Sequence, residues 1–207
     1  MKNYLQKTLL IAVSLFIAIA VSAQNTTTDV AQTISKDATT TETHLGDKGS
    51  DIFELGITYY IPDYNADKAY ALGFDFQGGK YLFKNFYLKG GIGILHAYCT
   101  YSKDFYSQNT SLRIPITLGY TLPFGKKAGL SLYTGPHLNL IVGGKTEYNG
   151  ETTRLKDIED VKRFGADWTV GATLNLWGFG LSVEYMAMLG DNANFANSLG
   201  VGLKIGF

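Results

Sequence analysis

Eight ionisable side chains lie on the polar face of segments in which apolar and polar residues alternate. They are the residues of this sequence most suited to ion pairing, ion conduction or acid–base chemistry. They are Glu54, Asp75, Lys89, Arg113, His137, Asp167, Glu184 and Lys204. An enclosed charge is costly unless it is paired. We therefore expect Glu54 to pair with Lys204 and Asp75 with Lys89, in a network that either plugs an interior or lines a path for ions or small solutes.

His137 is the residue with the clearest potential as a general base. Asp167 or Glu184 could orient its ring, and a hydrolase acting on lipid at a rim would then need a nucleophile beside it. Ser131 and Ser182 are the hydroxyl candidates, but neither is near His137 in sequence. We expect a hydrogen-bonded structural histidine and no enzyme activity.

Metal and cofactor chemistry finds little support in the sequence. The three histidines (His44, His96 and His137) and the single cysteine, Cys99, are dispersed, without the spacing of a zinc site. Residues 191–194 contain Asp and Asn but lack the Gly and terminal Glu of a calcium loop. We expect no cofactor, no metal and, with one cysteine, no intrachain disulfide.

The elements that position these residues are eight segments with a period of two, typical of strands exposed on one side. They are expected at 52–61, 69–78, 86–98, 111–122, 129–142, 165–176, 179–188 and 199–207. Each has about the ten residues that a tilted strand needs to cross a bilayer, and the connections alternate between short and long. The pattern predicts an all-β fold, an eight-stranded antiparallel up-and-down transmembrane β-barrel.

The two faces differ in side-chain size, which indicates which one is outside. The polar face is rich in glycine, whereas Leu, Ile, Val and Phe crowd the other face. An eight-stranded barrel has an interior just wide enough for side chains to fill, so small residues suit the lumen. Aromatic residues also gather at both predicted rims, as in the belts of membrane barrels. We expect the apolar face to meet lipid and the polar lumen to be plugged.

Two local features qualify this pattern. Pro115 and Pro136 lie within predicted strands, where each removes a ladder hydrogen bond and marks either a bulge or poor pairing. The charge-rich connection 143–164 contains Asn149-Gly150, a strong hairpin signal, so the strands beside it are candidates to extend beyond a membrane.

The N-terminal region has a different composition. Residues 1–23 resemble a signal peptide, with Lys2 and Lys7 before an apolar run and a cleavage site after Ala23. Residues 24–50 form a Thr-rich leader that we expect to be disordered, before a barrel at 51–207. Cleavage removes two of the 18 Lys and Arg and none of the 18 Asp and Glu, which leaves a formal charge of −2 and argues against nucleic acid as a partner.

Three stretches resemble the PorT-like outer-membrane β-barrel family. They are the run 112–120 (LRIPITLGY), the run 134–140 (TGPHLNL) and the turn 84–88 (KNFYL), together with the terminal Phe207. The resemblance covers about 51–207. It implies an outer-membrane barrel inserted by the barrel-assembly machinery, with Phe207 as the assembly signal, and it implies no particular activity.

The function expected from these features is non-enzymatic. The protein would act as a structural element or through its outer loops, with outer-membrane lipid around it and an extracellular partner at loop 143–164. The alternative is a narrow porin-like channel, which requires a continuous wet path past Arg113 and Glu184. A rim-acting hydrolase is the third hypothesis.

Overall fold

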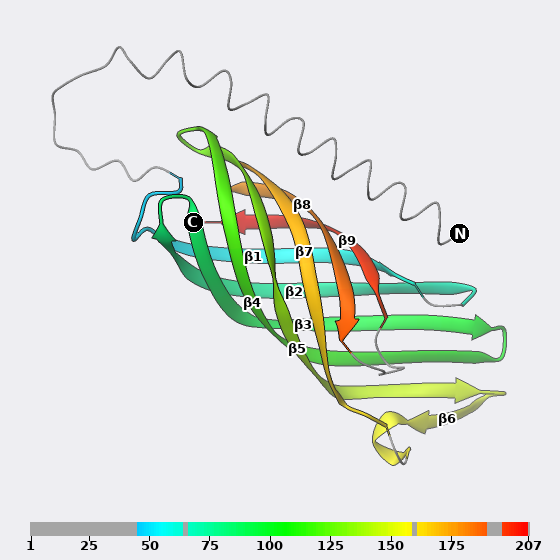
Figure 1. The fold of residues 1–207 in the computed structure, drawn as a ribbon. Helices are drawn as coiled ribbons and strands as arrows, with labels where there is room; N and C mark the ends of the chain where they lie inside the picture. The colour runs from blue at the N-terminus through cyan, green and yellow to red at the C-terminus, as the bar shows by residue number, and fades with distance from the viewer. Residues whose placement is uncertain (1–44, 64–65, 159–160, 190–195, 207) are drawn as a thin grey trace, which may run out of the picture.

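The protein folds into a closed ring of strands with one short strand outside it (Figure 1). The computed structural model describes residues 45–63, 66–158, 161–189 and 196–206. Its elements are β1 (Asp51–Pro62), β2 (Lys68–Phe83), β3 (Phe86–Ser102), β4 (Phe105–Gly125), β5 (Ala128–Tyr148), β6 (Glu151–Arg154), the 3₁₀ turn η1 (Leu155–Asp157), β7 (Phe164–Leu176), β8 (Phe179–Leu189) and β9 (Ser198–Gly206).

All pairings are antiparallel, and each ring strand pairs with its neighbour in sequence, β7 following β5. The last strand, β9, pairs with β8 on one side and β1 on the other, from Glu54 opposite Gly206 to Pro62 opposite Ser198. Closure leaves the ring without an open edge. The predicted eight-stranded antiparallel up-and-down barrel is confirmed, and β6 is an addition that pairs only with β5.

The two ends of the barrel differ in their connections. At one, which we call the turn end, β2–β3, β4–β5 and β7–β8 are joined at 84–85, 126–127 and 177–178. Left-handed backbone at Asn85 (φ 70°) and Trp177 (φ 50°) makes two of these turns. At the opposite end, the hairpin end, β2, β3, β4 and β5 continue past β7, β8 and β9 (Figure 1).

The hairpin end corrects one expectation and confirms another. Residues 99–110, expected to be a loop, belong mostly to β3 and β4, which meet in a turn at 103–104. Asn149 (φ 51°) and Gly150 (φ 82°) make the predicted hairpin turn between β5 and β6. With 21 residues each, β4 and β5 are about twice as long as the ~10 residues that cross a bilayer.

The prolines mark poor pairing and not a bulge. Pairing of β4 with β5 is interrupted between Pro115 and Leu118, and the register is the same on both sides of the gap. Pairing of β4 with β3 is likewise interrupted between Arg113 and Ile116. Pro115 therefore lies beside or within a gap in both ladders, as expected for a residue without an N–H.

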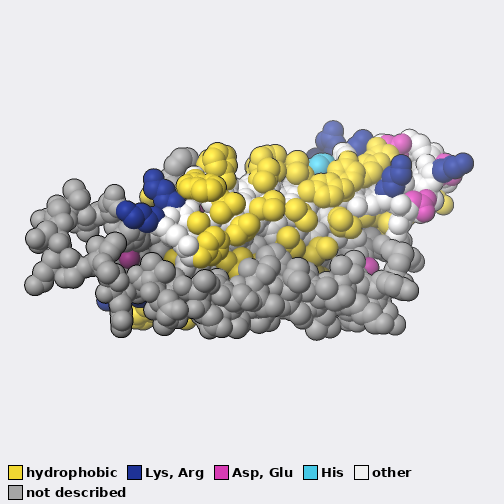
Figure 2. Space-filling model, turned by 90° about the horizontal axis from the view of Figure 1, so that it is seen from above, with side chains coloured by type: hydrophobic (Ala, Val, Ile, Leu, Met, Phe, Trp, Pro, Cys, Tyr) yellow, Lys and Arg dark blue, Asp and Glu magenta, His cyan; other side chains and the backbone are white. Residues whose placement is uncertain are grey.

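Large apolar side chains point outward on every ring strand, as the alternation predicts. Exposed examples include Leu55, Ile57, Phe74, Ile92, Ile94, Leu112, Ile114, Leu138, Leu140, Val170, Leu181, Val201 and Leu203. On the face that Figure 2 shows, hydrophobic side chains form a yellow belt, with charged residues gathered at its two ends. Charged and hydroxyl-bearing side chains fill the lumen, so the protein is apolar outside and polar inside.

Residues 45–50, which we expected to belong to a disordered leader, are held at the turn end instead. The amide of Gly49 donates to the carbonyl of Tyr81 (2.8 Å), and the amide of Asn85 donates to the carbonyl of Gly46 (2.8 Å). Leu45 is half-buried and lies against Gly129. The predicted signal peptide and residues 24–44 lie outside the described residues, as does Phe207.

The gap at the prolines makes Gly135 sensitive to substitution. A Cβ at this position would overlap the carbonyl oxygen of Ile116, a backbone atom of the neighbouring strand. We expect Gly135→Ala to lower the free energy of unfolding by about 1–3 kcal/mol, the usual effect of overpacking. Urea titration of the refolded protein in micelles measures this. Gly143→Ala is the control, because nothing lies within 4 Å of its Cβ position; equal losses would contradict the explanation.

Candidate functional site

The eight ionisable residues singled out in the sequence all lie in the lumen, and each ring strand supplies one of them. From β1 to β9 they are Glu54, Asp75, Lys89, Arg113, His137, Asp167, Glu184 and Lys204. We call this set, with the side chains that bridge it, the lumen network. It has three layers along the barrel axis.

The layer nearest the turn end is a carboxylate between two ammonium groups. Glu54 Oε1 lies 2.9 Å from Lys89 Nζ and 3.4 Å from Lys204 Nζ. The predicted pair of Glu54 with Lys204 is therefore present, but the predicted pair of Asp75 with Lys89 is wrong. The register places Asp75 opposite Gly93, four residues along β3 from Lys89 and so about 13 Å away.

The middle layer centres on Arg113, which is 1% exposed. Its guanidinium donates to the hydroxyl of Tyr60 (2.9 Å) and to Nδ1 of His137, and lies 3.8 Å from Asp75. Glu184 accepts hydrogen bonds from two tyrosines, Tyr60 (2.5 Å) and Tyr133 (2.7 Å). Lys204 Nζ donates to the hydroxyl of Tyr133 (3.3 Å), which joins this layer to the first.

The third layer, toward the hairpin end, holds Asp167. Its carboxylate accepts hydrogen bonds from Asn139 (2.6 Å) and Thr169 (3.3 Å), and it lies 3.2 Å from Nδ1 of His137. Since a guanidinium can only donate, Nδ1 of His137 accepts from Arg113. Nδ1 therefore cannot also donate to Asp167, and the ring of His137 lies between two charged groups of opposite sign while hydrogen-bonding to only the positive one.

Two tyrosines that the sequence analysis missed connect the layers. The guanidinium of Arg113 lies over the ring of Tyr60 (5.4 Å to the centroid), and Lys204 Nζ lies over that of Tyr133 (4.4 Å). The rings fit because lumen glycines face them: a Cβ on Gly200 would collide with Tyr60, and one on Gly171 with Tyr133. In the alternating pattern both tyrosines fall on the polar face of their strands. That position is the feature of the sequence from which their place in the lumen could have been predicted.

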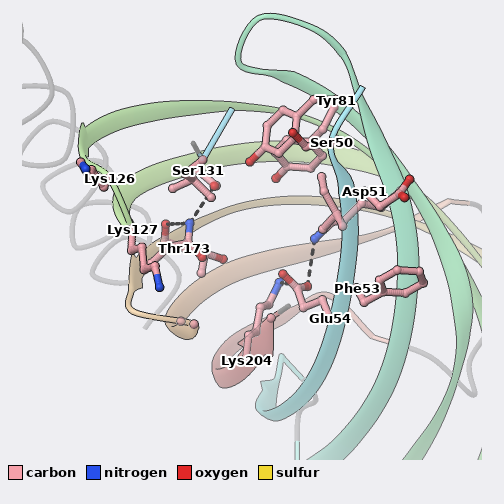
Figure 3. A pocket seen from close by; sticks show the side chains of 18 residues that line it. Ser50, Asp51, Phe53, Glu54, Tyr81, Lys126, Lys127, Ser131, Thr173 and Lys204 are labelled. Atoms are coloured by element: carbon pink, nitrogen blue, oxygen red, sulfur yellow. Dashed lines mark hydrogen bonds and ion pairs between the residues drawn. The ribbon is translucent and has the colours of Figure 1, made fainter. Parts of the chain in front are cut away.

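The network leaves little space in the middle of the barrel. The void between its layers has a volume of about 10 Å³, which is the space of a single water molecule. Toward the hairpin end an apolar cluster follows, made by Tyr60, Ala71, Leu95 and Met186. At the turn end a cavity of about 350 Å³ ends on the first layer, where Figure 3 shows Glu54 and Lys204 pointing toward one another.

Among the described residues neither serine candidate hydrogen-bonds to His137, whereas the hydroxyl of Thr169 lies 3.2 Å from its Nδ1. Ser131 bonds to Thr121 (2.9 Å) and Asn175 (2.8 Å), and Ser182 has no hydrogen-bond partner among the described residues. His137 is buried. His96, on the outer surface, bonds to Thr110 (2.9 Å).

The described residues contain no group of three or more His, Cys, Asp or Glu residues that could hold a metal ion. No helix among them is long and apolar enough to cross a membrane.

No known protein family and no curated protein matches this chain in sequence. Three solved structures illustrate its similarity to other barrels. Ail of Yersinia pestis, in complex with the heparin analogue sucrose octasulfate, has 14% identity and a TM-score of 0.41, over 77% of this chain and 98% of that one. The N-terminal barrel of Pseudomonas aeruginosa OprF has 14% identity and a TM-score of 0.39, over 78% of this chain and 100% of that one. A designed transmembrane β-barrel has 11% identity and a TM-score of 0.38, over 78% of this chain and 98% of that one.

The first layer provides a test of the network. Glu54→Gln leaves two lumen ammonium groups without their shared carboxylate, and we expect a loss of about 3–5 kcal/mol in the free energy of unfolding. Asp51→Asn is the matched control, since it breaks an exposed pair with Lys80 (3.3 Å) at the same end of β1 and should cost less than about 1 kcal/mol. Urea titration followed by tryptophan fluorescence measures both, and equal losses would show that Glu54 does not hold the layer together.

Proposed function

We propose that this protein is an outer-membrane β-barrel with a non-enzymatic role, either structural or in surface interaction through its hairpin end, and with a plugged lumen. The observation that carries the proposal is the distribution of side chains, apolar on the outside of every ring strand and charged within. A soluble barrel buries its apolar face instead. Contiguous apolar surface on this scale is stable only when lipid or another apolar partner covers it.

Aromatic rows at the two ends of the belt support the same location. Toward the hairpin end Tyr59, Tyr70 and Tyr98 stack across three strands, with centroids 6.3 and 5.3 Å apart. Toward the turn end Phe86 packs on Tyr120 at 4.6 Å. Tyrosine rings favour the headgroup level of a membrane, so these rows are expected at its two surfaces.

The closed middle of the barrel favours a plug over a porin-like channel. A channel needs a continuous wet path past Arg113 and Glu184, yet both side chains are buried and hydrogen-bonded to tyrosines. Function is then expected at the surfaces of the barrel. The hairpin end offers an extended sheet, with Tyr101, Phe105 and Tyr148 packed side by side near its tip (4.9 and 6.0 Å).

Several narrower points belong to the same proposal. We propose export with cleavage after Ala23, insertion by the barrel-assembly machinery with Phe207 as signal, and an extracellular partner at 143–164. Membership of the PorT-like family is supported by the motifs at 112–120 and 134–140.

A charge in the belt tests the membrane location. Ile92 (67% exposed) lies midway between the aromatic rows on β3, and Tyr148 (63% exposed) lies at the hairpin end. We expect Ile92→Lys to destabilise the barrel in lipid vesicles by about 2–4 kcal/mol, as for a charge at the midplane of a bilayer. Tyr148→Lys should have almost no effect. Urea unfolding in vesicles, followed as loss of the heat-shifted band on a gel, gives the free energy of unfolding of each variant. If neither variant were destabilised, the membrane location would be contradicted.

Planar-bilayer recording tests the plug. We expect no discrete conductance steps from refolded protein whose gel mobility shifts on boiling, because the lumen network blocks the barrel. Steps that change in Arg113→Gln or Glu184→Gln but not in the exterior control Lys145→Gln would instead establish a channel.

A further inference from the structure

Two adjoining concavities lie on the protein surface at the hairpin end, and basic residues line both. Their volumes are about 300 and 330 Å³, and they share Gly143, Gly144 and Arg154. The first also has Lys156 and Arg163 in its wall, and the second has His96 and Lys145. Among the described residues no Asp or Glu lines either concavity. We call these two concavities the basic pocket.

A β-bulge brings the basic side chains to this surface. Thr110 pairs with Gly143 but Ser111 pairs with Ile141, so Val142 is one extra residue on β5. Before the bulge the outward residues are Leu138 and Leu140. Without it the alternation would turn Gly144 outward and Lys145 inward, whereas the extra residue puts Lys145 on the outer face.

The pocket is held in place by backbone contacts. Arg154 lies directly across from Lys145 in the β5–β6 pair. The amide of Ile141 donates to the carbonyl of Arg163 (2.8 Å), which fixes that residue beside the bulge. Leu155, next to Arg154, is buried against Ile141. The basic groups therefore come from segments whose relative positions are already set.

Within the described parts of the chain, most charges of the pocket have no ion-pair partner. Arg154, Lys156 and Arg163 form no ion pair with another described residue. Glu147, which follows Lys145 on the outer face, accepts hydrogen bonds from Tyr106 (2.6 Å) and Thr152 (3.2 Å). The bond from Tyr106 lowers the pKa of Glu147, so it offsets one positive charge at neutral pH and leaves the others.

The location of the pocket indicates what kind of anion reaches it. Leu140, Val142 and Phe164 are exposed at the adjoining end of the apolar belt. On the other side the row of stacked tyrosines continues from Tyr98 to Tyr106 (5.8 Å) and ends at Lys145, whose Nζ lies 5.4 Å from the Tyr106 centroid. A ligand here meets an apolar surface on one side and cations on the other, which is the pattern of a lipid with an anionic headgroup.

We propose that the basic pocket binds the phosphate group of a membrane lipid whose acyl chains lie along the belt beside Leu140, Val142 and Phe164. This inference rests on the proposed membrane location. Arg154 serves both concavities, and guanidinium groups suit phosphate because they donate to two oxygens at once.

Lipid titration of the folded full-length mature chain in detergent, followed by native mass spectrometry, tests the proposal. The probes are phosphatidic acid and diacylglycerol with the same acyl chains, which differ only in the phosphate. We expect tighter binding of phosphatidic acid, and a rise of its dissociation constant in Arg154→Gln/Arg163→Gln of about fivefold for each charge removed. The matched control is Lys126→Gln/Lys127→Gln, which removes two charges at the turn end and should leave the constant unchanged.

Each other result overturns the proposal in a distinguishable way. Equal binding of the two lipids, or equal losses in both double variants, would remove the phosphate site. Binding of inorganic phosphate as tight as that of phosphatidic acid would assign the pocket to a free anion. A sample whose gel mobility does not shift on boiling would instead contradict the barrel in a membrane, and with it the proposed function.

Discussion

The fold depends on the pairing of charges inside a narrow ring. Glu54, Arg113 and Glu184 cannot be left unpaired there, and their partners come from other strands. Because each ring strand contributes one ionisable residue, a slip of any strand by one position would turn its charge into the apolar exterior and leave a partner unmatched. The network thus specifies the register of all eight strands at once, a task that the exterior, with its interchangeable Leu, Ile and Val side chains, cannot perform.

The same network separates the interior from the places where the protein can act. Tyrosine rings over lumen glycines, such as Tyr133 over Gly171, fill the space between the charged layers and leave room for about one water. What remains accessible is the exterior and the two ends. The hairpin end combines long strands, aromatic residues near the tip and a basic pocket at the margin of the belt, so it is where recognition is expected.

Alternation was sufficient to predict the eight ring strands, the outward face and the eight ionisable residues of the lumen, because a period of two is visible in single residues. Contacts that depend on the stagger between strands were not predictable in this way, which is why Lys89 was assigned to Asp75 and not to Glu54. Tyr60 and Tyr133 were missed because tyrosine suits either face. The strands at 99–110 were missed because their residues, polar and aromatic on both faces, lack contrast.

The single extra residue at Val142 has a further consequence for how this barrel can change over evolutionary time. Below the bulge, β5 must keep the alternation that lipid imposes; above it, the same strand follows the opposite phase. A one-residue insertion or deletion at this point would exchange the entire inner and outer faces of the projecting hairpin without altering any residue in the bilayer. The bulge therefore uncouples two selective pressures within one continuous strand, so that the exposed surface can diversify while the membrane-embedded wall stays constant.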